Sequence, residues 1–227
     1  MSISSNLTEI LEKIKAAALK AGRDPAKVRL VAVSKTKPAS MIEEALAVGQ
    51  TIFGENYVQE FVAKATEAKL PVEWHFIGHL QSNKVKYIAG LTSLIHSVDR
   101  LSLAEEINRQ WAKTGRVCDI LIQVNISGEA TKSGTTSEEA INLVRQVSIL
   151  ENLRICGLMT MPPFFDNPDG ARPYFSGLRA LSKEIESLHI NNVSMKELSM
   201  GMSGDFEVAI EEGATLVRIG SAIFGGR

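Results

Sequence analysis

The sequence has little of several features that mark particular protein classes. It contains only two cysteines, Cys118 and Cys156, in no CxxC or metal-ligand spacing, so we expect reduced structural thiols. No segment approaches the roughly 18 consecutive apolar residues of a membrane span. Glu9, Glu12 and Lys13 interrupt the apolar run that a signal peptide would need. These absences favour a protein of the cytoplasm.

An excess of one charge sign is also missing. Lys and Arg number 25 against 26 Asp and Glu, for a net charge of −1. This balance gives no electrostatic reason to expect nucleic acid or an anionic membrane as a partner. Hydrophobic residues make up 44% of the 227, enough for a substantial core. Because no linker or second core is visible, we expect one domain over residues 1–227 and a monomer.

The spacing of hydrophobic residues switches regularly along the chain between the period of a helix and the period of a strand. Ile3, Leu7, Ile10 and Ile14 form one helical stripe, which Gly22 ends. After it, buried strands and amphipathic helices take turns. The predicted strands are 28–33, 51–54, 74–77, 94–98, 120–125, 155–160, 197–200 and 216–220, and the helices between them are 38–48, 56–68, 82–89, 101–112, 137–149, 171–188 and 205–212.

Eight strands, seven of them followed by a helix, predict parallel pairing with right-handed crossovers. The count favours a closed (β/α)8 TIM barrel, in which the N-terminal helix fills the place left after the last strand. A doubly wound open sheet is the alternative, but it requires no such count.

In barrels of this kind the active site lies at the carboxyl ends of the strands. That rule selects a short list of candidates, which are Lys35, Asn56, His79, Asp99, Asn125, Thr160, Ser203, Arg218, Gly220 and Ser221. The ends of the last two strands, where barrels commonly bind phosphate, carry residues 199–204 (Ser-Met-Gly-Met-Ser-Gly) and the pair Gly220-Ser221. Glycines let the backbone approach an anion and hydroxyls donate to it, although ordinary strand-to-helix turns have the same composition.

Two cationic residues share the inner face of their strands. Val31, Val33 and Lys35 lie on one face because side chains alternate along a strand, and Lys35 then reaches the inner rim. A dehydrated amine there suits imine formation, whereas an isolated lysine could equally extend into solvent. Arg218 shares a face with Gly220 and needs an acceptor, which could be a carboxylate, a ligand anion or an aromatic nitrogen.

Two further features have structural interpretations that we prefer. His75 and His79 are two strand steps apart on one face, but a third metal ligand is not apparent, so structural or cofactor-lining roles are favoured. The loop at residues 162–170, rich in Pro and Asp, follows the sixth strand. It could form a lid, although a plain surface loop is the simpler interpretation.

Several blocks together resemble the pyridoxal phosphate homeostasis proteins. They are residues 31–36 (Val-Ala-Val-Ser-Lys-Thr), 53–57 (Phe-Gly-Glu-Asn-Tyr), 74–81 (Trp-His-Phe-Ile-Gly-His-Leu-Gln), 157–161 (Gly-Leu-Met-Thr-Met), 198–203 (Leu-Ser-Met-Gly-Met-Ser) and 217–221 (Val-Arg-Ile-Gly-Ser). The blocks run in order from the first strand to the last and cover nearly the whole chain.

The resemblance implies a barrel like the N-terminal domain of alanine racemase, with pyridoxal 5'-phosphate held as a Schiff base on Lys35. It implies phosphate contacts from Ser203, Gly220 and Ser221, and contact between Arg218 and the pyridine nitrogen. It also places Asn56 at the cofactor mouth.

As to function, the resemblance implies a non-catalytic carrier or regulator in vitamin B6 and amino-acid homeostasis, whose further partners are amino acids or apoenzymes that use the cofactor. A low-activity racemase dependent on the same cofactor is the first rival. A barrel enzyme acting on a sugar phosphate is the second.

Overall fold

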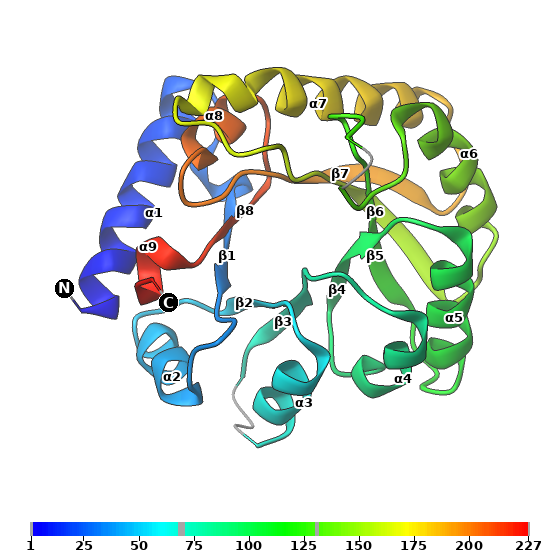
Figure 1. The fold of residues 1–227 in the computed structure, drawn as a ribbon, viewed down its shortest axis with the longest axis horizontal. Coiled ribbons are helices and arrows are strands. Elements are labelled where there is room, and N and C mark those ends of the chain that lie inside the picture. Colours follow the sequence, from blue (N-terminus) through cyan, green and yellow to red (C-terminus); the bar gives the residue numbers. More distant parts are fainter. Residues whose placement is uncertain (1, 68–70, 130–131, 227) are drawn as a thin grey trace.

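The computed structural model describes residues 2–67, 71–129 and 132–226. Eight parallel strands close into a barrel in which each strand pairs with its neighbours in chain order and β8 pairs with β1 (Figure 1). The strands are β1 (Arg29–Val33), β2 (Ile52–Glu55), β3 (Glu73–Phe76), β4 (Leu94–Val98), β5 (Cys118–Gln123), β6 (Leu153–Met159), β7 (Val193–Ser199) and β8 (Leu216–Ile219). The predicted (β/α)8 barrel is confirmed, with strand ends shifted by at most four residues.

The helices surround the barrel on the outside (Figure 1). They are α1 (Ile3–Lys20), α2 (Ala39–Ala47), α3 (Val58–Glu67), α4 (Val85–Ile88), α5 (Leu101–Ala112), α6 (Ser137–Ser148), α7 (Arg172–Ser187), α8 (Phe206–Glu211) and α9 (Ser221–Phe224). None of these is long and apolar enough to cross a membrane. The expectation that no helix follows the last strand is wrong, because the chain forms the single turn α9 directly after β8.

Helix α1 occupies the gap beside the last strand, as its position in the sequence predicts. The side chain of Ser2 accepts a hydrogen bond from the backbone N–H of Ser5 at 3.2 Å and caps the helix. The buried stripe Ile3, Leu7, Ile10 and Ile14 then faces the barrel, and α1 packs against α8, α9 and α2. This contact completes the outer ring.

Alternation along the strands divides the core into two layers. The outer layer lies between strands and helices and contains Phe53, Phe61, Trp74 and Phe76, with the ring of Phe61 edge-on to that of Trp74 at 5.7 Å. The inner layer fills the barrel with a separate group of buried apolar residues, which are Val31, Ile52, Ile77, Leu94, Leu121, Met159 and Leu216. The two cysteines are free thiols.

A buried cluster of charges fixes the carboxyl end of β1. Lys64 of α3 donates to the carbonyl of Ser34 at 2.7 Å, to Glu55 at 2.7 Å and to Glu60 at 2.6 Å. The hydroxyl of Ser34 donates to the same Glu55 oxygen at 2.6 Å. Burial raises the pKa of Glu55, and the hydrogen bonds from Lys64 and Ser34 act against that rise. The cluster therefore ties β1, β2 and α3 together immediately beside position 35.

Replacing Lys64 by methionine should destabilise the fold in a pH-dependent way. Removing one partner of a buried ion pair costs about 3–5 kcal/mol, so the free energy of unfolding should fall by about that amount near neutral pH. Without the cation the pKa of Glu55 rises further. Since a raised pKa favours the protonated folded form, the loss should shrink as the pH falls toward the usual glutamate value of 4.5.

Urea unfolding of the parent and variant at several pH values measures this difference. Lys13→Met is the matched control, because Lys13 pairs with Glu9 on an exposed helix surface and such pairs contribute little to stability. A Lys64→Met loss that is no larger than the control's, or that does not vary with pH, would contradict the assignment.

Candidate functional site

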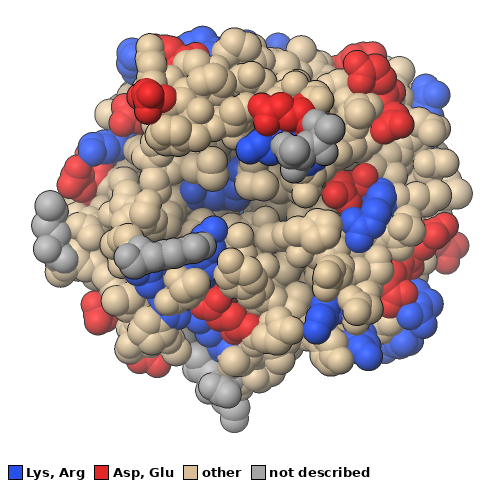
Figure 2. Space-filling view, viewed as in Figure 1, with Lys and Arg blue, Asp and Glu red and all other residues tan. Residues whose placement is uncertain are grey.

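One cavity of about 450 Å³ opens at the carboxyl ends of the strands, a size typical of small-ligand sites. All six residues that the sequence analysis assigned to the cofactor line it, namely Lys35, Asn56, Ser203, Arg218, Gly220 and Ser221. Figure 2 shows basic side chains in a hollow near the centre of this face, and the cationic residues that line the cavity are Lys35, Lys37 and Arg218. The site therefore favours an anionic ligand.

Lys35 stands on a tightly constrained turn. Val33 ends β1 and lines the cavity, and Thr36 has a φ of 63°, in the left-handed region that β-branched residues rarely adopt. The backbone N–H of Thr36 donates to Glu60 at 2.5 Å, while Glu55 and Lys64 hold the preceding Ser34. Hydrogen bonds therefore hold the residues directly before and after Lys35. The side chain of Lys35 is half-buried at the rim of the cavity.

Arg218 lies buried at the inner end of the cavity. Its Nη1 donates to Ser199 Oγ at 2.6 Å, and its Nη2 donates to the carbonyl of Thr160 at 3.0 Å. Burial lowers the pKa of Arg218 to about 10, with the charge of Asp205 acting against the shift. The guanidinium therefore remains protonated at neutral pH, and its five N–H groups exceed the two hydrogen bonds found among the described residues.

Hydroxyls and backbone amides converge at the ends of β7 and β8. The hydroxyl of Ser221 donates to that of Ser203 at 3.2 Å, which joins the two turns. Among the described residues, no hydrogen bond is donated by the backbone N–H groups of Ser203, Gly204 and Ser221. A side chain at Gly220 would crowd the carbonyl of Val33 at 3.0 Å. These free donors and the close backbone approach match the predicted anion site.

Asn56 contributes an unused acceptor. Its Oδ1 is buried and has no hydrogen-bond partner among the described residues. The predicted helix start at residue 56 is two residues early, because α3 begins at Val58 and leaves Asn56 in the turn beside the cavity. A Cβ at Gly78 would collide with the backbone of Asn56, so glycine is required there for the two turns to meet. A buried acceptor without a partner fits a ligand that donates a hydrogen bond.

Several of the residues that the sequence placed at the carboxyl ends of the strands lie outside the cavity. His79, Asp99 and Asn125 do not line the cavity; Asp99 pairs with Arg100 at 2.6 Å, and Asn125 donates to the carbonyl of Glu129 at 2.9 Å. Thr160 takes part only through its contact with Arg218.

The expectation that His75 and His79 share one strand face is wrong. Strand β3 ends at Phe76, so the alternation stops before His79, which is exposed. His75 instead contacts His96, with 2.9 Å between His75 Nδ1 and His96 Nε2. The described residues contain no group of three His, Cys, Asp or Glu side chains placed to hold a metal ion.

The loop after β6 lines the cavity, contrary to the plain surface loop that we preferred. Met161, Pro163, Phe164 and Phe165 all border the cavity. Phe165 packs against Tyr174 of α7 at 5.7 Å between ring centroids, whereas Phe164 is 85% exposed at the rim. Sequence reasoning also missed Lys37 and Ile77, and their place in the lining follows only from the closed barrel.

Comparison with known proteins agrees with this geometry. The family model for the N-terminal domain of alanine racemase matches residues 5–227. The pyridoxal phosphate homeostasis protein of Aquifex aeolicus is 48% identical over 228 residues, covering 100% of this chain and 99% of the relative. PipY of Synechococcus elongatus, solved with pyridoxal phosphate bound, superposes with a TM-score of 0.86 at 34% identity and covers 99% of this chain and 100% of PipY.

Likeness to a full-length racemase is confined to the fold. The alanine racemase of Corynebacterium glutamicum superposes with a TM-score of 0.74 at 15% identity. The match covers 97% of this chain but only 62% of the racemase. Full-length similarity to the homeostasis proteins, joined to a barrel that matches the racemase N-terminal domain, identifies the family: this chain belongs to the pyridoxal phosphate homeostasis proteins.

Proposed function

We propose that this chain binds pyridoxal 5'-phosphate covalently through Lys35 and serves as a non-catalytic carrier or regulator in vitamin B6 and amino-acid homeostasis. One observation gives the main support for this proposal. A half-buried lysine, a cluster of free anion donors and a buried guanidinium line a single cavity, and these are the groups needed for an aldehyde, a phosphate and a ring nitrogen on one molecule.

Each residue has a distinct task in this proposal. The amine of Lys35 condenses with the aldehyde and releases one water. Ser203, Gly220 and Ser221 bind the phosphate with hydroxyl and backbone donors, and Arg218 donates to the ring nitrogen. The unpartnered Oδ1 of Asn56 accepts from a donor on the ring. Bound in this way, the cofactor would supply a carbon–nitrogen double bond at which an incoming amine can displace the amine of Lys35.

The charge of Arg218 supports a carrier rather than a catalyst. Pyridoxal phosphate acts as an electron sink when its ring nitrogen is protonated, and a guanidinium with a pKa near 10 donates a hydrogen bond but keeps its proton. None of Tyr57, Tyr87 and Tyr174 lines the cavity, so no tyrosine is placed there to act as an opposing base.

The proposed partners beyond the cofactor are amino acids or apoenzymes that use pyridoxal phosphate. The cavity opens to the surface beside the exposed Phe164, so an incoming amine has a route to Lys35. We propose that the carrier is a cytoplasmic monomer.

Lys35→Ala should abolish the covalent link and leave the barrel folded, because a rim lysine contributes little to the core. Borohydride reduction of the loaded protein followed by peptide mapping locates the modified residue. Lys37→Ala is the matched control, since Lys37 lines the same cavity but donates to the carbonyl of Gly226 at 2.9 Å. Label on Lys37, or label retained in Lys35→Ala, would show that the assignment is wrong.

Ser203→Ala and Ser221→Ala should each weaken cofactor binding by about 1.5–3 kcal/mol, the contribution of a hydrogen bond to a charged acceptor. The loss should be larger for pyridoxal phosphate than for pyridoxal, which lacks the phosphate. Equilibrium dialysis of both compounds measures it. Ser187→Ala, on α7 outside the cavity, should change neither affinity. Equal losses for the two compounds would mean that these hydroxyls do not contact phosphate.

The loaded protein should not exchange the α-proton of an amino acid with solvent, because the ring lacks a proton on its nitrogen and no tyrosine lines the cavity to act as an opposing base. Deuterium incorporation into L-alanine in heavy water, followed by NMR, tests this against the racemase alternative. The Lys35→Ala variant gives the background rate. Incorporation that exceeds this background and yields the D-isomer would establish a racemase.

A further inference from the structure

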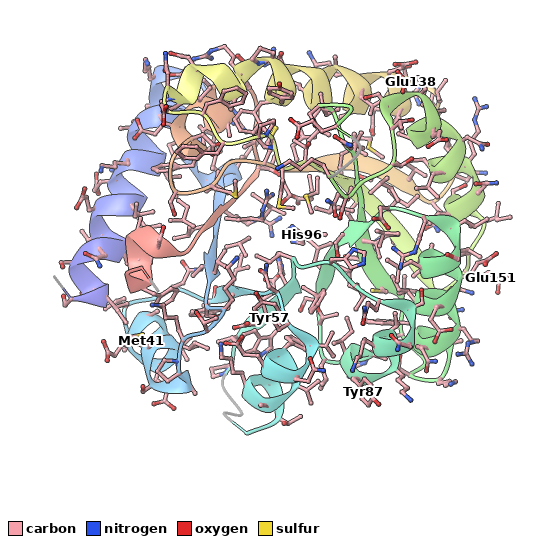
Figure 3. All side chains as sticks on the ribbon, viewed as in Figure 1. Met41, Tyr57, Tyr87, His96, Glu138 and Glu151 are labelled. Atoms are coloured by element: carbon pink, nitrogen blue, oxygen red, sulfur yellow. The ribbon has the colours of Figure 1, made fainter. Side chains whose placement is uncertain are left out.

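A chain of hydrogen bonds crosses the interior of the barrel, starting from Arg218. Arg218 Nη1 lies 2.6 Å from Ser199 Oγ, which lies 2.8 Å from His96 Nδ1. His96 Nε2 lies 2.9 Å from His75 Nδ1, and His75 Nε2 lies 3.0 Å from Glu73 Oε1. Figure 3 shows His96 near the centre of the ring of strands. The chain joins β8, β7, β4 and β3 through side chains alone.

The chain runs from the cavity to the opposite end of the barrel. Arg218 lines the cavity, and the side chains of Ser199, His96 and His75 are fully buried. Glu73 is the first residue of β3, and its side chain is 44% exposed at the amino ends of the strands. The guanidinium at the floor of the cavity is therefore connected to a carboxylate that water reaches from the other side.

With a neutral His75, the position of every proton in the chain follows from its two ends. A guanidinium only donates and a carboxylate only accepts. Ser199 Oγ accepts from Arg218 and directs its own proton to His96 Nδ1. His96 then carries its proton on Nε2 and donates to His75, which donates from Nε2 to Glu73. The arrangement requires a neutral His96, and burial, the largest cause, lowers the pKa of His96 well below its usual value.

Other charged groups near the chain are already engaged. Arg29 pairs with Glu197 at 2.6 Å, and the second oxygen of Glu197 accepts from Thr215 at 2.6 Å. Asp205, whose charge acts on Arg218, accepts the backbone N–H of Met202 at 2.6 Å. No hydrogen bond joins these groups to the chain in the part of the protein that the structure describes, so the side-chain support for Arg218 comes through Ser199.

We propose that His96, supported by His75 and Glu73, is a positioning residue that fixes the Arg218 guanidinium against a ring nitrogen at the floor of the cavity. With His96 accepting its proton, the hydroxyl of Ser199 keeps a lone pair directed at Arg218, and linked hydrogen bonds strengthen one another. Without that acceptor the hydroxyl rotates freely, and the carbonyl of Thr160 is left as the one fixed acceptor of the guanidinium among the described residues. The inference rests on the proposed binding of pyridoxal phosphate.

Two substitutions at position 96 separate the hydrogen bond between His96 and Ser199 from the hydrogen bond between His96 and His75. The amide oxygen of His96→Asn takes the place of Nδ1 and still accepts from Ser199, whereas the amide of His96→Gln reaches the place of Nε2 and leaves Ser199 without its acceptor. Ser199→Ala removes the link with a small change in volume. Gln123→Met is the control, because Gln123 is buried in the barrel but bonds to the carbonyl of Ser133 at 3.0 Å.

The probes are pyridoxal phosphate and its carbocyclic analogue, in which C–H replaces the ring nitrogen. Their dissociation constants are measured by absorbance titration, and the ratio of the two is compared among variants. A general loss of folded protein lowers both affinities alike and leaves the ratio unchanged. A change in the ratio therefore reports on the contact to the nitrogen, and thermal melting checks each variant's fold.

We expect the parent to prefer pyridoxal phosphate by about tenfold or more, the value of a hydrogen bond from a charged donor. His96→Asn and Gln123→Met should keep the preference, while His96→Gln and Ser199→Ala should lose most of it. A full preference in His96→Gln and Ser199→Ala would overturn the positioning role of His96. A parent that binds both probes equally would show that Arg218 does not contact the nitrogen, and a parent that binds neither would overturn the proposed function itself.

Discussion

The buried cation of Arg218 is the constraint around which the site is arranged. Burial of an ionised group is costly unless it is hydrogen-bonded, and here two of its donors reach protein acceptors, a hydroxyl and a carbonyl rather than a carboxylate. These two neutral acceptors therefore do not neutralise the positive charge of Arg218. Together with Lys35 and Lys37 it makes the cavity attractive to an anion.

A second group of charges is kept apart from that cavity. Lys64 pairs with one oxygen of Glu55 and one oxygen of Glu60 beneath the turn that carries Lys35. Among the described residues, no ion pair joins Lys35 to either carboxylate. The turn is thereby held in a strained conformation at Thr36 while the amine of Lys35 stays available to a ligand.

The sequence was sufficient for the barrel and for six of the residues that line the cavity. Strands and helices alternate with distinct periods, and period-two alternation places Val31, Val33 and Arg218 on the inner face. Alternation does not reveal which inward residues meet across the barrel. The contacts of His96 with His75 and Ser199 depend on strand stagger and closure, and His79 was misplaced because β3 ends three residues earlier.

The central claim is that Lys35, the Ser203–Ser221 turns and Arg218 hold the two ends and the ring of one pyridoxal phosphate molecule. A crystal structure of the loaded protein tests this most directly. The account predicts electron density continuous with Lys35 Nζ, phosphate oxygens within hydrogen-bonding distance of the Ser203 and Ser221 hydroxyls, and the ring nitrogen facing Arg218. A phosphate bound elsewhere, or a ring turned so that its nitrogen faces away from Arg218, would contradict it.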